Sequence, residues 1–146
     1  MAYTKLLVHC VFSTHGRRKS IPPALQPDLW AYMGGIARKH RCKALAVGGA
    51  SDHAHLLLSL PADMPVSKAV QVIKAGSSKW LHEQKRALFS WQEAYGGFTI
   101  GASQVARTVA YIQSQAAHHR RVSFEDEFRS LLARYGVEYD PKYLFA

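Results

Sequence analysis

The alternation of apolar and polar positions along the chain predicts four strands and four helices. Strands are expected over residues 3–12, 42–47, 53–60 and 96–101, where short apolar segments end at proline, glycine or polar residues. Helices are expected over 22–40, 65–85, 103–118 and 123–135, where apolar side chains recur at helical spacing. The order strand, helix, strand, strand, helix, strand is that of the ferredoxin-like split βαβ fold. The sequence therefore predicts an α/β protein with an antiparallel sheet and two further C-terminal helices.

Length and charge narrow the class of protein. A chain of 146 residues with 48% hydrophobic residues can bury one core, and we expect residues 1–146 to form a single domain. Its 19 Lys and Arg against 10 Asp and Glu give a net charge of +9, which favours nucleic acid as partner ahead of a membrane surface. The apolar runs are too short to span a bilayer, and the N-terminus lacks a secretory pattern, so we expect a cytoplasmic protein. Cys10 and Cys42 form no C-x-x-C pair and are expected to be buried thiols.

Two histidines begin the third predicted strand, in the segment Asp52-His53-Ala54-His55. Side chains at i and i+2 leave the same face of a strand, so both imidazoles would face one patch of the sheet and could hold one metal ion. Eight histidines in 146 residues would give about 0.4 such pairs by chance. The pair therefore indicates a metal site only together with a third ligand and a nucleophile.

Tyr111 and Gln115 supply these two groups in the helix predicted over 103–118. They are four residues apart, so a phenol and an amide oxygen lie on one helical face, whereas Gln113 faces roughly the opposite side. Two neutral imidazoles and a neutral amide oxygen would form a site without protein charge. Such a site suits a divalent cation whose other partners are water and a substrate phosphate. We expect it to bind metal weakly until the nucleic acid arrives.

These residues resemble the single-tyrosine HUH transposases of short bacterial insertion sequences and their relatives associated with repetitive extragenic palindromes. HUH denotes His, hydrophobic, His, which residues 53–55 match. The resemblance implies that Tyr111 is the nucleophile and that Gln115 is the third metal ligand beside His53 and His55. Residues 91–98 and 135–139 are also similar to the family, so the resemblance covers nearly the whole chain.

The chemistry that this resemblance implies is transesterification on single-stranded DNA near a hairpin. Tyr111 would attack the phosphate and leave a 5′-phosphotyrosine and a free 3′-hydroxyl. A divalent metal, with Mg²⁺ as first choice and Mn²⁺ as second, would polarise a phosphate oxygen. The sequence identifies no general base. Because the family usually works as a homodimer, in which the tyrosine helix can complete the partner's site, we expect a homodimer.

Basic residues near these segments are the expected phosphate contacts: Arg17, Arg18, Lys19, Lys74, Lys79, Arg120 and Arg121. His118 and His119 are expected to be solvated histidines at a helix end, with contact to DNA or the metal shell as the alternative. His9 is expected to be structural.

Two other functions stay open from the sequence. One is a non-catalytic module of the same fold that holds single-stranded nucleic acid. The other is a metal-dependent hydrolase that uses His53 and His55 with water as the nucleophile. A covalent adduct would exclude the first, and loss of cleavage without Tyr111 would exclude the second.

Overall fold

The centre of the molecule is an antiparallel sheet of four strands with the order β2-β3-β1-β4. The computed structural model describes residues 1–119 and 121–146. The strands are β1 (Leu6–Ser13), β2 (Lys43–Gly49), β3 (His53–Leu60) and β4 (Gly96–Thr99). This order, with the first and third strands as central neighbours, confirms the predicted split βαβ topology.

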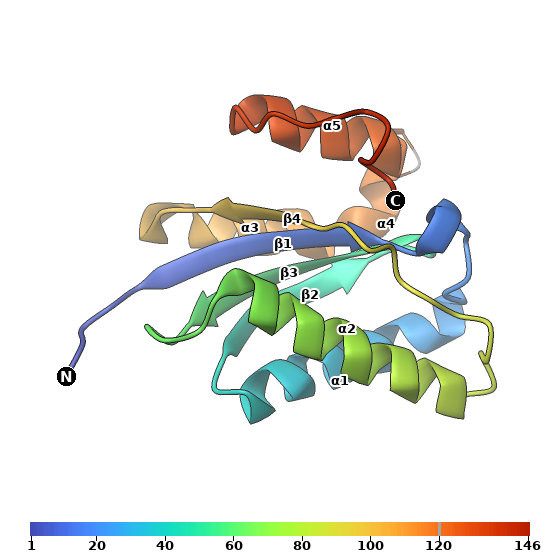
Figure 1. Ribbon diagram of the computed structural model, residues 1–146, viewed down its shortest axis with the longest axis horizontal. Coiled ribbons are helices and arrows are strands. Elements are labelled where there is room, and N and C mark those ends of the chain that lie inside the picture. Colours follow the sequence, from blue (N-terminus) through green and yellow to red (C-terminus); the bar gives the residue numbers. More distant parts are fainter. Residues whose placement is uncertain (120) are drawn as a thin grey trace.

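Helices cover both faces of the sheet (Figure 1). The long helices α1 (Gln26–Lys39) and α2 (Val66–Glu83) lie on one face, and the C-terminal helices α3 (Val105–Gln113), α4 (Gln115–His118) and α5 (Phe124–Arg134) lie on the other. The described residues also form three short 3₁₀ helices: η1 (His15–Arg17), η2 (Pro23–Leu25) and η3 (Ala102–Gln104). No helix in the described part of the chain is both long and apolar enough to cross a membrane.

The alternation within β1 and β3 assigns one face of each strand to each helical layer. Val8, Cys10 and Phe12 of β1 join the core under α1 and α2, together with the even-numbered apolar residues of β3. Odd-numbered positions face the opposite layer, where Val11 packs with α5 and Leu57 packs with α3. On that face α3 and α5 belong to two apolar clusters separate from the main core, and the polar side chains of Tyr111, Gln115 and Glu127 meet there.

The helix expected over 103–118 is interrupted at Ser114, where α3 ends and α4 begins. The Ser114 hydroxyl donates to the Tyr111 carbonyl over 3.1 Å, and the Gln115 side-chain amide donates to the same carbonyl over 3.3 Å. In a continuous helix this carbonyl would accept the backbone N–H of Gln115. Side-chain donors thus compete with the backbone at this carbonyl, and α3 ends at Gln113, two residues before Gln115.

The last helix lies within the range predicted for it, 123–135. At its start the Ser123 hydroxyl accepts the backbone N–H of Asp126 over 3.2 Å, which is an N-cap contact. Gly136, after the helix, has a φ of 62°, a left-handed conformation that glycine adopts without strain. These two caps define α5, which carries an acidic side chain into the site described next.

Candidate active site and metal centre

The sheet supplies the base of the site through the two histidines of β3. His53 and His55 are fully buried and lie opposite Ser13 and Val11 of β1 in the antiparallel register. Because β3 is hydrogen-bonded to strands on both sides, the two rings are fixed on a rigid support. They leave the same face, as predicted, and their ring centroids are 5.1 Å apart.

The helical layer brings the predicted partners to this pair within one chain. Gln115 Oε1 lies 3.0 Å from His53 Nε2, and the Tyr111 ring meets the His55 ring edge-on at a centroid distance of 5.6 Å. Gln113 is exposed on the other side of the helix, as expected. Tyr111, Gln115, His53 and His55 therefore form one cluster, although 56 residues or more separate the tyrosine from the histidines in sequence.

Glu127 of α5 is the central site residue that the sequence analysis missed. It is 3% exposed, and its carboxylate accepts hydrogen bonds from His55 Nε2 over 3.0 Å and from the Tyr111 hydroxyl. Gln115 Nε2 lies 3.3 Å from the same carboxylate. The cluster therefore contains a buried carboxylate beside the neutral ligands that the sequence predicted. One signal was present in the sequence, since Glu127 occupies an inward position between Phe124 and Phe128 on the apolar side of an amphipathic helix.

His119 also belongs to the site and is not the solvated histidine that we expected. Its Nε2 lies 3.1 Å from Glu127 Oε1, and its ring centroid is 4.2 Å from that of His53. His118 reaches the other carboxylate oxygen, with Nε2 3.3 Å from Oε2. Among the described residues, one ligand atom from each of His53, His55, His119 and Glu127 lies within 4.8 Å of the other three.

Two further residues orient the histidine pair from behind. Asp52 Oδ1 lies 2.7 Å from His53 Nδ1, and His9 Nε2 lies 2.8 Å from His55 Nδ1. In metal sites the ring nitrogen that does not bind the metal usually bonds to such a partner, which fixes the tautomer and the ring orientation. His9, expected to be structural, thus holds His55 so that Nε2 faces the cluster.

Burial and hydrogen bonding set the charges in the site. Burial alone would raise the pKa of Glu127, but hydrogen bonds from His119, His55 and Tyr111 outweigh it and hold that pKa well below its ordinary value. Burial lowers the pKa of His55 to about 4, although Glu127 partly offsets the effect. The pKa of Tyr111 is raised by burial and by the hydrogen bond to Glu127. At neutral pH the protein alone thus presents an anionic carboxylate, a neutral His55 and a neutral phenol.

A cation fits the donor set of this cluster. When Nδ1–H of His53 donates to Asp52, the other ring nitrogen, Nε2, is free to present a lone pair. That lone pair faces Gln115 Oε1. The orientation of this amide is fixed because its nitrogen donates to the Tyr111 backbone carbonyl and to the Glu127 carboxylate. Two acceptors that face each other at 3.0 Å are unfavourable unless a proton or a metal ion lies between or beside them.

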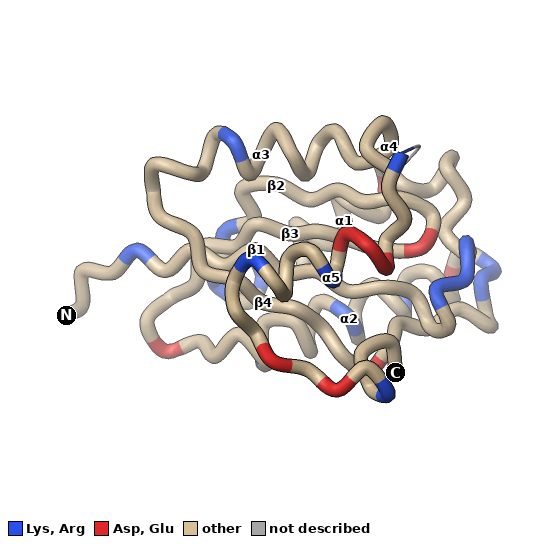
Figure 2. The backbone as a smooth tube through the Cα atoms, turned by 90° about the horizontal axis from the view of Figure 1, so that it is seen from above, with Lys and Arg blue, Asp and Glu red and all other residues tan. Residues whose placement is uncertain are grey.

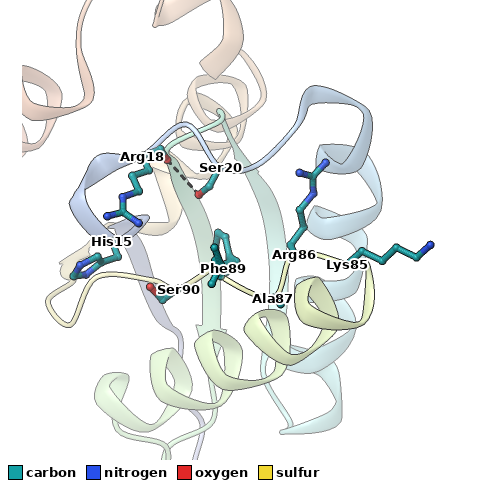
Figure 3. A pocket seen from close by; sticks show the side chains of 9 residues that line it. His15, Arg18, Ser20, Lys85, Arg86, Ala87, Phe89 and Ser90 are labelled. Atoms are coloured by element: carbon teal, nitrogen blue, oxygen red, sulfur yellow. Dashed lines mark hydrogen bonds between the residues drawn. The ribbon is translucent and has the colours of Figure 1, made fainter.

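The predicted phosphate contacts separate into three groups. Arg17, Lys19 and Arg121 line a pocket of about 620 Å³ that also contains His119, so they border the site directly. Arg18 lines another pocket, of about 410 Å³, with His15, Lys85 and Arg86, and Figure 3 shows the Arg18 and Arg86 side chains around it. Figure 2 shows that Lys and Arg are spread over several elements, α3 among them.

The third group lies on α2, across the sheet from the histidines (Figure 1). Lys79 is exposed there, whereas the Lys74 ammonium donates to the backbone carbonyls of residues 92–94 at 2.8–3.2 Å. Arg120, also expected to contact phosphate, lies outside the described residues. A third pocket, of about 380 Å³, reaches Tyr111 and Glu127 from the other side and is lined by Arg107 and Arg134, which the sequence analysis did not select.

Comparisons with known proteins identify the family of the chain. Residues 2–115, which include His53, His55, Tyr111 and Gln115, match the family described as IS200-like transposases. No curated protein sequence matches the chain.

Two solved structures share its fold. One is a protein from Deinococcus radiodurans R1 that was assigned as a transposase, with 21% identity, a TM-score of 0.64, and coverage of 78% of this chain and 93% of that one. The other is a REP-associated tyrosine transposase bound to a REP hairpin, with 19% identity, a TM-score of 0.60, and coverage of 95% of this chain and 86% of that one. The family match over most of the chain confirms the resemblance seen in the sequence, and the chain belongs to the IS200-like transposase family.

Proposed function

We propose that this transposase cleaves and rejoins single-stranded DNA by transesterification through Tyr111, with a divalent metal held by His53, His55 and Gln115. One observation carries the proposal: within a single chain, the Tyr111 ring and the Gln115 amide oxygen converge on the two histidines of β3. A tyrosine that served only the core would have no reason to share a buried polar cluster with three imidazoles and a carboxylate.

Tyr111, Glu127 and the metal have separate roles in the proposed reaction. The Tyr111 oxygen attacks the phosphorus, the bond from phosphorus to the 3′-oxygen breaks, and the products are a 5′-phosphotyrosine and a free 3′-hydroxyl. Glu127 accepts the hydrogen bond of the Tyr111 hydroxyl and so orients it before attack. A bound divalent cation would supply Lewis-acid stabilisation of the charge on the phosphate. Reversal by another 3′-hydroxyl rejoins the strand, because the phosphotyrosine bond conserves the energy.

The substrate that we propose is single-stranded DNA flanked by a hairpin. The related REP-associated transposase was solved with a REP hairpin, and the pocket lined by Arg17, Lys19 and Arg121 adjoins the histidines here. Cations at that position would hold phosphates of a strand that enters the site. Mg²⁺ or Mn²⁺ as the metal, a homodimer as the assembly and the cytoplasm as the location stay predictions. Within one chain, Tyr111 and Gln115 already lie beside the histidines, which supports a site completed by its own tyrosine helix.

The test is a covalent adduct between protein and DNA. End-labelled, hairpin-flanked single strands are incubated with protein and Mg²⁺ or Mn²⁺, and the products are separated on a denaturing gel. We expect a labelled, denaturant-resistant band that Tyr111→Phe abolishes, while DNA affinity stays within a few fold because the ring is retained. Tyr32→Phe, on α1 across the sheet, is the matched control and should keep the band.

The stability of the variant must be checked, since Tyr111→Phe removes a hydrogen bond to a charged group. Such a bond contributes about 1.5–3 kcal/mol. Two other side chains, those of Gln115 and His118, still lie near the same carboxylate oxygen, so a buried charge is not left without partners. Cleavage by Tyr111→Phe at the parental rate would show that water or another residue attacks, and the proposal would be wrong.

A further inference from the structure

Three imidazole nitrogens surround one oxygen of Glu127. From Oε1, the Nε2 atoms of His55, His119 and His53 lie at 3.0, 3.1 and 3.7 Å. The side chains of Glu127 and of both β3 histidines are at most 2% exposed, and that of His119 is 11% exposed. A buried carboxylate oxygen with three imidazole nitrogens around it is the arrangement expected of metal ligands grouped around one point.

We propose that Glu127 is an anionic ligand of the metal and that His119 is a further imidazole ligand, so that both join His53 and His55 in the centre. This inference rests on the proposed function in one respect, because both place the metal at His53 and His55. It adds two ligands, and it changes the charge of the site and the class of metal that the site prefers.

The donor set determines the preferred metal. Three imidazoles and one carboxylate favour first-row transition metals such as Mn²⁺, Co²⁺ or Zn²⁺, whereas Mg²⁺ prefers a shell made of oxygen atoms. A carboxylate also neutralises part of the metal charge, so the centre needs no DNA phosphate to complete it. We therefore expect tight binding of a transition metal to the DNA-free protein, in contrast to the weak binding that the uncharged ligand set predicted.

The supporting contacts fit the same assignment. Asp52 on His53 and the His9 ring on His55 orient both Nε2 atoms toward Glu127. The second oxygen of Glu127 accepts the Tyr111 hydroxyl, so Glu127 joins the metal centre to the nucleophile. Glu127 and His119 follow the tyrosine in sequence, and the metal would thus tie α5 and the α4–α5 connection to the sheet.

Cobalt binding to the DNA-free protein tests the inference. Co²⁺ is titrated into the parent, Glu127→Gln and Asp126→Asn, and the visible absorption of the bound ion reports both affinity and coordination. Asp126 is the matched control, because it lies on the same helix turn with a 72% exposed side chain. We expect Glu127→Gln to weaken Co²⁺ binding by about 100-fold or more and to change the spectrum, and Asp126→Asn to leave both unchanged. The parent should bind Co²⁺ far more tightly than Mg²⁺ in competition.

A second measurement does not depend on whether Glu127→Gln folds. X-ray absorption of the cobalt-loaded parent counts imidazole ligands, and three imidazoles support the inference whereas two overturn it. Parental Co²⁺ affinity in a folded Glu127→Gln, or no Co²⁺ binding by the DNA-free parent, would also overturn it. The proposed function is judged separately by the Tyr111 adduct. An adduct without Glu127-dependent metal binding refutes only the inference, and Glu127-dependent binding without an adduct refutes only the proposed function.

Discussion

Gly48→Ala probes how the tyrosine helix is held against the sheet. Gly48 of β2 lies opposite His55 in the antiparallel register, and α3 passes directly over it. A Cβ added at Gly48 would lie 2.5 Å from the Ile112 carbonyl oxygen, whereas an ordinary contact begins at 3.4 Å. The backbone of Gly48 is not left-handed, so this contact is the source of strain. Ile112 follows Tyr111, and the substitution therefore displaces the segment that carries the hydroxyl.

The expected magnitude follows from that distance. The helix must retreat by roughly 1 Å, and overpacking of this kind costs about 1–3 kcal/mol of unfolding free energy. For a chain of this length each kcal/mol lowers the melting temperature by about 2–4 °C. A displacement of about 1 Å in a positioned reacting group can reduce the rate about 100-fold. DNA affinity should change less than the rate, because the basic residues that line the pockets around Arg17 and Arg18 are on other elements, although Arg107 is on α3.

Three measurements on Gly48→Ala check this reasoning: thermal unfolding, the rate of adduct formation with labelled single strands, and DNA affinity. Gly35→Ala is the matched control, since a Cβ at that helical position meets nothing within 4 Å. That control should keep the parental rate and gain up to about 1 kcal/mol of stability. Parental stability and rate in Gly48→Ala would show that α3 does not rest on β2 as described.

Three further predictions concern stability and DNA binding. Replacing Arg17, Arg18 and Lys19 with Ala should weaken binding of single strands and flatten its salt dependence by about 0.7 per lost phosphate contact, which affinity measured against salt concentration would show. In EDTA, the free energy of unfolding should fall by about 3 kcal/mol as the pH drops from 6.5 to about 4, because His55 takes up a proton in the unfolded chain but stays neutral when buried. Denaturant titrations at several pH values measure this dependence, and His55→Gln should make it weaker. Lys74→Met should lower unfolding free energy by about 1.5–3 kcal/mol and Lys79→Met by less than about 0.5, since only Lys74 donates to the carbonyls of residues 92–94.

The sequence by itself determined the elements and two local geometries. Strands and helices follow from side-chain periodicity, which is a property of neighbouring residues, and so does the common face of His53 and His55. The spacing of Tyr111 and Gln115 likewise predicted that both reach one target, and they do so in the structure even though the helix is interrupted at Ser114.

Only the tertiary structure decided which other groups complete the site. Glu127 is 72 residues from His55, and no local pattern states that α5 docks over β1 and β4 with this carboxylate inward. The same holds for Lys74. In the sequence it cannot be told from the other lysines, but in the fold its ammonium donates to a backbone carbonyl. Periodicity specifies the direction in which a side chain leaves its own element. The groups it meets depend on how distant elements pack, and that packing is determined by the whole chain.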